Sequence, residues 1–171
     1  MIDQASCILV HLVEKRSVGE RFLRHRNTWP LHITLVPWFY IDQEKEAALI
    51  TSLDMYSRTR HGFQAVVGQE HIFTGGKQEV RVNLMADQSP IKSLHTDLFG
   101  LVRSYYTSFH ADKPYIEDRF IAHITHHELE GVTHRRTASD SEEIDTVTLL
   151  RLAPSQPTDY CEVVANFAFK N

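Results

Sequence analysis

Cysteine and long apolar runs are both scarce in this chain, which has two cysteines among 171 residues. Cys7 and Cys161 each lie inside an apolar segment, which suits small buried residues of a reducing compartment better than a disulfide framework. No run approaches the roughly 18 apolar residues that a membrane-spanning helix needs. Asp3 stands where a signal peptide would be basic. We therefore expect a soluble, cytoplasmic protein that makes no membrane contact.

Net positive charge and the usual nucleophile and nucleotide motifs are also missing. The formal net charge is -4, so the chain as a whole does not attract polyanions, although a small anionic ligand remains compatible with it. The pair Gly75-Gly76 lacks the G-x-x-x-x-G-K-[ST] pattern and predicts a turn. No serine stands in a G-x-S-x-G elbow. The sequence thus argues against a P-loop and against a Ser-His-Asp hydrolase.

The composition that is present, 42% hydrophobic and 23% charged, is ordinary for a globular protein and allows a sizeable core. Apolar periodicity predicts strands and helices in the order strand, strand, helix, strand, strand, helix, strand, strand, strand. Ser89-Pro90 is a typical helix start. The expected strands are 6–13, 31–39, 62–68 with 71–73, 78–85, 119–127, 144–153 and 160–169, and the expected helices are about 43–58 and from 89 onward.

The triplet H-I-T occurs twice, at His32-Ile33-Thr34 and His123-Ile124-Thr125, and the chain contains no other H-x-T. Both copies lie in apolar segments that read as strands. Because side chains alternate between the faces of a strand, the histidine and threonine of each copy share one face while the isoleucine points into the core. We expect an α+β fold over 1–171, a single bilobal domain with two pseudo-symmetric halves and an active-site cleft between them. Each half is expected to contain an antiparallel sheet and helices.

Two imidazoles and two hydroxyls in one cleft suit a particular chemistry. Histidine titrates near neutral pH, so a neutral ring can accept a proton while a protonated partner donates one to a leaving oxygen. Threonine hydroxyls can donate hydrogen bonds to the non-bridging oxygens of a phosphate. A lone histidine on such a strand is more often a satisfied structural residue. The matched second copy favours acid-base catalysis on a phosphodiester, without a metal or other cofactor.

The sequence resembles the 2H phosphoesterase superfamily, which includes the 2′-5′ RNA ligase-like proteins and cyclic phosphodiesterases and is defined by two H-x-T motifs. The resemblance implies that His32 and His123 are the acid-base pair and that Thr34 and Thr125 bind the phosphate. The segments that carry it are TWPLHITLVPWF, GFQAVVGQEHIFTGGKQEVRVNL, RFIAHITHHE and IDTVTLLRL.

That resemblance also implies a substrate: a nucleotide or short RNA with a 2′,3′-cyclic phosphate or a 2′-5′ linkage, on which the reaction could run in reverse as ligation. We expect a monomer without an obligate protein partner. Two departures bear on the substrate class. His126 follows the second threonine, where the family often has an apolar or small residue, and Ala122 replaces a common proline.

Further phosphate contacts are open to two interpretations. Arg119 shares the face of His123 by strand parity, which makes it a candidate phosphate ligand. A second group either lines the cleft entrance or belongs to a solvated loop. That group consists of Arg21, Arg24, His25, Arg26 and Trp29.

Two alternative functions remain open. One is a binding module that holds a nucleotide or RNA end without cleaving it. The other is a zinc hydrolase built on His123, His126 and His127. We expect no metal, because strand parity turns His126 away from His123. The aromatic residues Phe73, Tyr105, Tyr106 and Phe120 are expected in the core.

Overall fold

The computed structural model describes residues 4–23, 29–74, 79–110, 115–129, 132–153 and 160–170, with the backbone alone for 127–129, 132–134 and Ala153. The strands are β1 (Gln4–Leu12), β2 (Arg21–Leu23), β3 (His32–Asp42), β4 (Phe63–Phe73), β5 (Val80–Met85), β6 (Tyr106–Phe109), β7 (His123–Thr125), β8 (His127–Leu129), β9 (Val132–His134), β10 (Ser141–Ile144), β11 (Thr146–Ala153) and β12 (Tyr160–Ala168). The helices are α1 (Gln43–Ser57), α2 (Ser89–Val102) and the 3-10 helix η1 (Glu117–Arg119).

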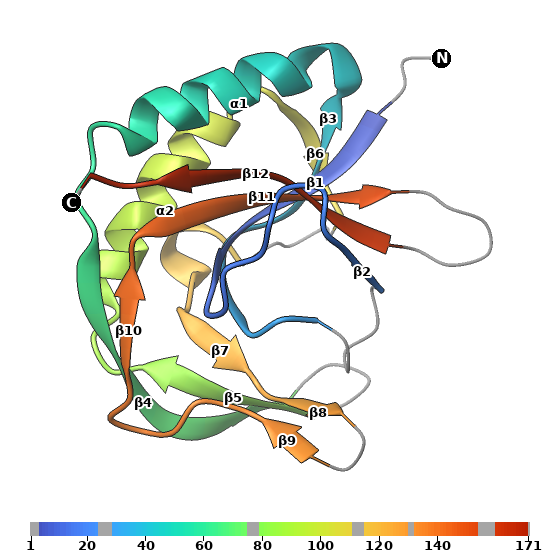
Figure 1. Ribbon diagram of the computed structural model, residues 1–171. Helices are drawn as coiled ribbons and strands as arrows, with labels where there is room; N and C mark the ends of the chain where they lie inside the picture. The colour runs from blue at the N-terminus through green and yellow to red at the C-terminus, as the bar shows by residue number, and fades with distance from the viewer. Residues whose placement is uncertain are drawn as a thin grey trace.

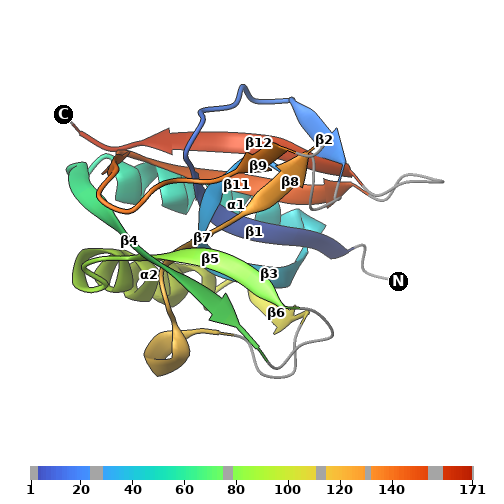
Figure 2. The ribbon, with the colours of Figure 1, turned by 90° about the horizontal axis from the view of Figure 1, so that it is seen from below.

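One antiparallel sheet runs through the molecule in the order β10-β4-β5-β7-β3-β1-β11-β12-β2, with β6 paired to β3. Figure 2 shows β12, β11, β1 and β3 side by side. β8 and β9 form a separate hairpin at the end of the molecule away from α1 (Figure 1). The predicted α+β class is confirmed. The β7–β3 pair, a single register position, joins β10-β4-β5-β7 to the other five strands of the order.

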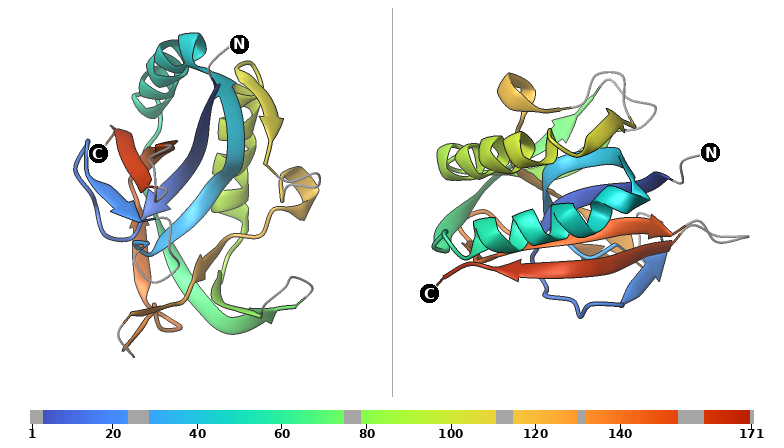
Figure 3. Two further views of the ribbon diagram at one scale, coloured as in Figure 1. Left: turned by 90° about the vertical axis from the view of Figure 1, so that its right-hand side faces the viewer. Right: turned by 90° about the horizontal axis from the view of Figure 1, so that it is seen from above.

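Both α-helices pack on the same side of the sheet (Figure 3). Pro90 in the first turn suits a helix start because proline has no N–H to leave unbonded there. The buried residues of α2 are Ile91, Leu94, His95, Leu98, Phe99 and Val102. Between helices and sheet lies the main core, which includes Ile33, Leu35, Leu49, Leu53, Ile91, Leu98 and Ile124. Burial of this apolar surface, at roughly 25 cal/mol per Å², holds the helices to the sheet.

The opposite face of β1 carries a second, smaller apolar cluster. Its buried members are Ile8, Val10, Leu12, Leu150 and Val163. Phe22, Trp29 and Trp38 pack against these residues and remain partly exposed. The sheet is therefore covered by helices on one face and partly by aromatic side chains on the other.

The strand expected over 119–127 is present but shorter than predicted. η1 occupies Glu117–Arg119, and β7 begins only at His123. Glu117 has a φ of 52°, and its N–H donates to Nε2 of His95 at 2.9 Å, so a tertiary hydrogen bond holds the chain in a turn here. The expected strands also leave out the short strands β2, β6 and β9 and most of β10. Period-two patterns are too brief in these segments to be recognised.

The expectation that Cys7 and Cys161 are small buried residues is confirmed, because both side chains are fully buried. Burial raises the pKa of the Cys7 thiol to about 12. Phe120 is buried in the main core, as predicted, and Tyr105 and Tyr106 pack partly exposed against it. No helix in the described residues is long and apolar enough to cross a membrane.

Candidate active site

The two H-I-T triplets lie side by side on adjacent antiparallel strands. Ile33 of β3 is directly opposite Ile124 of β7, and both isoleucines are fully buried in the main core. In an antiparallel pair, this register sets His32 beside Thr125 and Thr34 beside His123, all on the face opposite the isoleucines. Diagonal neighbours in such a pair are about 7–8 Å apart. The two imidazoles thus stand diagonally across one small patch.

Neighbouring strands supply an apolar surround to this patch. Val10 and Leu12 of β1 flank the first triplet, while Val82 and Leu84 of β5 flank the second. Of these four residues, only Leu84 is more than slightly exposed. Such walls lower the local dielectric and strengthen hydrogen bonds between the four polar side chains and a bound anion.

Each of the two imidazoles is oriented by a hydrogen bond to a backbone carbonyl oxygen. Nδ1 of His32 lies 2.9 Å from the carbonyl oxygen of Pro30, and Nδ1 of His123 lies 2.7 Å from that of Ile121. A carbonyl oxygen only accepts, so each Nδ1–H donates to the carbonyl two residues earlier. In the neutral form, each ring therefore presents the lone pair of Nε2, which is the atom that can take up a proton.

The burial of the four side chains differs. His32 is 9% exposed, whereas His123, Thr34 and Thr125 are partly exposed. Desolvation lowers the pKa of His123 below its usual value, and the hydrogen bond to Ile121 only partly offsets this effect. Within the described part of the chain, neither threonine hydroxyl is bonded to another protein group, so both can donate to a ligand.

An aromatic ring lies against each histidine. Trp29 meets His32 edge-on at 4.9 Å between ring centroids, and Phe73 meets His123 at 5.1 Å and 87°. Trp29 was a candidate from the sequence, but the assignment of Phe73 to the core is wrong because its partly exposed ring lies at the site. Phe73 also contacts His71 at 5.4 Å. Only the fold brings Phe73 to His123, so no local sequence signal could have found it.

Arg119 does not lie on a strand with His123, so strand parity does not place it on the face of that histidine. Arg119 ends η1 and is exposed, with its guanidinium over the ring of Tyr115 at 5.9 Å. Arg21 of β2 is 63% exposed and pairs with Glu162 at 3.2 Å. The remaining loop candidates, Arg24, His25 and Arg26, lie outside the described residues.

His126 is separated from the other histidines of the site. Its Nε2–H donates to Oδ1 of Asn83 at 2.6 Å, and Asn83 is paired with Ile124 and so lies on the opposite face of the sheet from His123. Strand parity had predicted this orientation. Among the residues whose side chains are described, no three His, Cys, Asp or Glu side chains are grouped as metal ligands.

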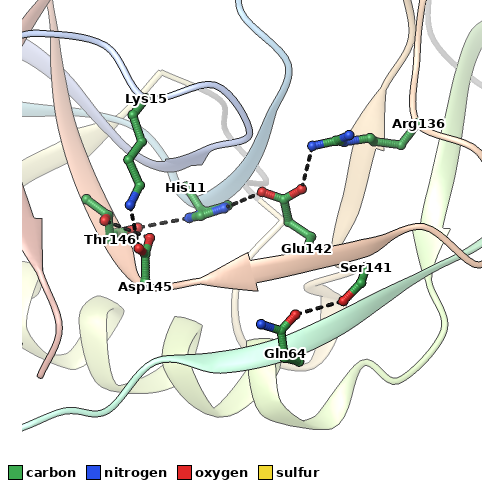
Figure 4. A network of polar contacts seen from close by, with 8 residues as sticks. All are labelled: His11, Lys15, Gln64, Arg136, Ser141, Glu142, Asp145 and Thr146. Carbon is green, nitrogen blue, oxygen red and sulfur yellow. Dashed lines mark hydrogen bonds and ion pairs between the residues drawn. The ribbon is translucent and has the colours of Figure 1, made fainter. Parts of the chain in front are cut away.

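A buried polar network ties together the two parts of the sheet behind the site. His11 of β1 donates through Nδ1 to the carbonyl of Thr146 at 3.0 Å, and its Nε2 lies 3.0 Å from Oε1 of Glu142 on β10 (Figure 4). The guanidinium of Arg136 donates a hydrogen bond to Oε2 of Glu142 at 2.9 Å. The Thr146 carbonyl only accepts, so Nδ1 of His11 carries a proton, and one further proton is shared between Nε2 of His11 and Glu142.

Solved structures share this arrangement of strands and helices. E. coli LigT complexed with 3′-AMP has a TM-score of 0.62 and 16% sequence identity, covering 99% of this chain and 100% of LigT. A crystal structure described as a phosphoesterase has a TM-score of 0.61 and 15% identity, covering 99% of this chain and 100% of that one. The chain has the fold of these proteins. At such identities the likeness concerns the fold alone.

A third similar structure is the protein TT0787 of Thermus thermophilus, with a TM-score of 0.60 and 13% identity over 96% of this chain and 97% of that one. No protein-family model matches the sequence, and no curated protein matches it either. The fold is thus shared with a phosphoesterase and with LigT, at low sequence identity to both.

Proposed function

We propose that this protein is a metal-independent phosphodiesterase that acts on a 2′,3′-cyclic phosphate or a 2′-5′ linkage at the end of a nucleotide or short RNA. The observation that carries the proposal is the Ile33–Ile124 register, which gathers two histidines and two threonines on one face. The fold neighbours support it, because LigT has been crystallised with 3′-AMP, NADP+, ATP and phosphate, all of which carry phosphoryl groups.

In the proposed reaction, His123 is the base and His32 is the acid. The lowered pKa of His123 keeps its Nε2 lone pair available at neutral pH. For a cyclic phosphate, Nε2 takes a proton from water as the water oxygen bonds to phosphorus. The bond between phosphorus and one ribose oxygen breaks, and Nε2–H of protonated His32 gives that oxygen its proton. Proton exchange with solvent then restores both rings.

The two threonines stabilise the charge that builds on the phosphate. Thr34 is set beside His123 and Thr125 beside His32, so each hydroxyl flanks the opposite histidine across the strand pair. Hydroxyls on two strands can donate to different non-bridging oxygens, which fixes the phosphate between the two imidazoles. The partly exposed Trp29 and Phe73 rings beside the histidines are positioned to contact the nucleoside.

The first experiment is a cleavage assay in excess chelator. Purified protein is incubated with 2′,3′-cyclic nucleotides and with 2′-5′ and 3′-5′ dinucleotides, and the products are resolved by chromatography. A folded His32→Ala, His123→Ala double variant is the control. Cleavage that survives chelation and requires both histidines supports the proposal and identifies the linkage.

Other results would change the assignment. Normal turnover by the folded double variant would remove the two-histidine mechanism. Cleavage that the chelator stops would instead indicate a metal-dependent hydrolase. Saturable binding of a cyclic nucleotide without product, even at high protein concentration, would indicate a binding module.

A further inference from the structure

The side chain of Gln88 forms two hydrogen bonds with the backbone of Ala122, the residue immediately before His123. Oε1 of Gln88 accepts the Ala122 N–H at 2.7 Å, and Nε2 of Gln88 donates to the Ala122 carbonyl at 3.0 Å. The same Nε2 donates to the carbonyl of Met85 at 2.9 Å. Both amide hydrogens and the amide oxygen thus have matching partners, which leaves one consistent orientation of the amide.

Gln88 is itself well anchored at a junction of three elements. It is the N-cap residue of α2, and it reaches back to Met85 at the end of β5. The Ala122 carbonyl also accepts the Met85 N–H at 3.0 Å. Ala122 is fully buried, and both its N–H and its carbonyl are hydrogen-bonded. β5 thus binds the Ala122 carbonyl through Met85, and the Gln88 amide provides the acceptor for the Ala122 N–H.

The hydrogen bond between Gln88 and Ala122 is linked to the imidazole of His123 through one peptide group. The Ala122 N–H and the Ile121 carbonyl belong to the same planar peptide and point in opposite directions. Gln88 binds the N–H edge, while the carbonyl edge accepts Nδ1–H of His123 at 2.7 Å. Fixing the direction of the N–H therefore fixes the direction of the carbonyl, and with it the ring that donates to that carbonyl.

We infer that Gln88 is a positioning residue that sets the orientation and tautomer of His123. The inference rests on the proposed function for its catalytic consequence, because the proton must sit on Nδ1 for Nε2 to act as the base. Its structural part, the coupling of Gln88 to the tautomer of His123, needs no assumption about the reaction. Gln88, at the start of α2, thus determines which ring nitrogen of His123 faces the substrate.

The test uses Gln88→Met, which keeps the length of the side chain and removes every hydrogen bond of the amide. The tautomer of His123 is read from the ring nitrogen shifts of 15N-labelled histidine, assigned by comparison with His123→Ala. We expect the Nε2–H tautomer to grow in Gln88→Met. We also expect kcat to fall about 10- to 100-fold, because the base is misoriented, while KM changes less than about twofold.

Two further variants separate positioning from general damage. Gln88→Glu keeps an acceptor for the Ala122 N–H, so its His123 tautomer should stay as in the wild type. Gln64→Met removes a similar amide, whose oxygen accepts from Ser141 on β10 at 2.7 Å, and should change neither the tautomer nor kcat.

The outcomes distinguish this inference from the proposed function. An unchanged His123 tautomer in folded Gln88→Met overturns the inference, whatever the activity. An equal tautomer shift in Gln88→Met and Gln88→Glu overturns it too, since the N–H acceptor would then be irrelevant. A shift confined to Gln88→Met, in a protein that cleaves no substrate of the panel, supports the coupling and removes only the proposed reaction.

Discussion

Ile33 and Ile124 face each other across the β3–β7 pair, and this contact is the only register position that joins the two parts of the sheet there. Both side chains are buried under the helices, so the polar residues on either side of each isoleucine must emerge together on the opposite face. A slip of one residue in either strand would bury a histidine and expose an isoleucine. The packing of two apolar residues thus fixes the relative position of four polar ones.

The first prediction concerns the relative weight of the four site residues. His32→Ala or His123→Ala should lower kcat on the order of 1,000-fold, since each removes a proton-transfer group. Thr34→Val or Thr125→Val should lower it less, on the order of 100-fold, because one hydrogen bond to the phosphate is lost and the other remains. Steady-state kinetics checks this order, with circular dichroism to show that each variant is folded. Threonine variants that lose as much as the histidine variants would contradict the division of roles.

The second prediction concerns the pH dependence of turnover. Burial lowers the pKa of His123, so as a base it should produce an acid limb of kcat/KM below the ordinary histidine value of about 6.5. Phe73→Ala removes the ring that covers His123, admits water and should move this limb to higher pH. Tyr115→Ala is a control, because Tyr115 is 70% exposed and its ring lies against Arg119 at 5.9 Å. A limb that stays in place or moves to lower pH in Phe73→Ala would show that desolvation by this ring is not the cause.

The faces of the two H-I-T triplets could be predicted from the sequence because strand parity is a local property. Parity put His32 with Thr34 and His123 with Thr125, and the burial of the isoleucines between them confirms this. Parity failed at Arg119, where the hydrogen bond between His95 and Glu117 replaces the strand with a turn. Local patterns carry no information about such tertiary bonds.

The register and the supporting contacts could not be predicted for a related reason. His11 and Glu142 are separated by 131 positions, and Gln88 and Ala122 by 34. Each partner looks ordinary in its own segment, so only the closed sheet reveals the pair. Buried polar residues such as His11 and His95 also resemble breaks in an apolar pattern, although in the fold they are fully bonded.

The third prediction concerns stability in acid. Burial lowers the pKa of His95, whose Nδ1–H donates to Leu35 and whose Nε2 accepts from Glu117. The unfolded state therefore binds more protons than the folded state, and stability is lost as pH falls below the unfolded value of about 6.5, by at most about 1.4 kcal/mol per pH unit for one group. In His95→Gln the amide can make both bonds without titrating, so the loss between neutral and acidic pH should shrink.

Urea unfolding at several pH values measures this loss. His61→Gln is the matched control, because His61 is exposed and its side chain makes no such bonds within the described residues. The same pH dependence in His95→Gln and in the wild type would show that other groups, such as His123 or His126, cause the acid sensitivity.

The last prediction concerns the buried pair of His11 and Glu142 behind the site. His11 is 1% exposed and Glu142 is 6% exposed, so His11→Leu or Glu142→Leu leaves a buried group without its partner and should cost about 3–5 kcal/mol. The double variant should recover much of this loss, because two leucines can pack together and the partly exposed Arg136 can turn to water. Chemical unfolding of the four proteins gives the coupling energy. Additive losses would mean that the two side chains stabilise the fold independently, and that the 3.0 Å contact between them contributes little.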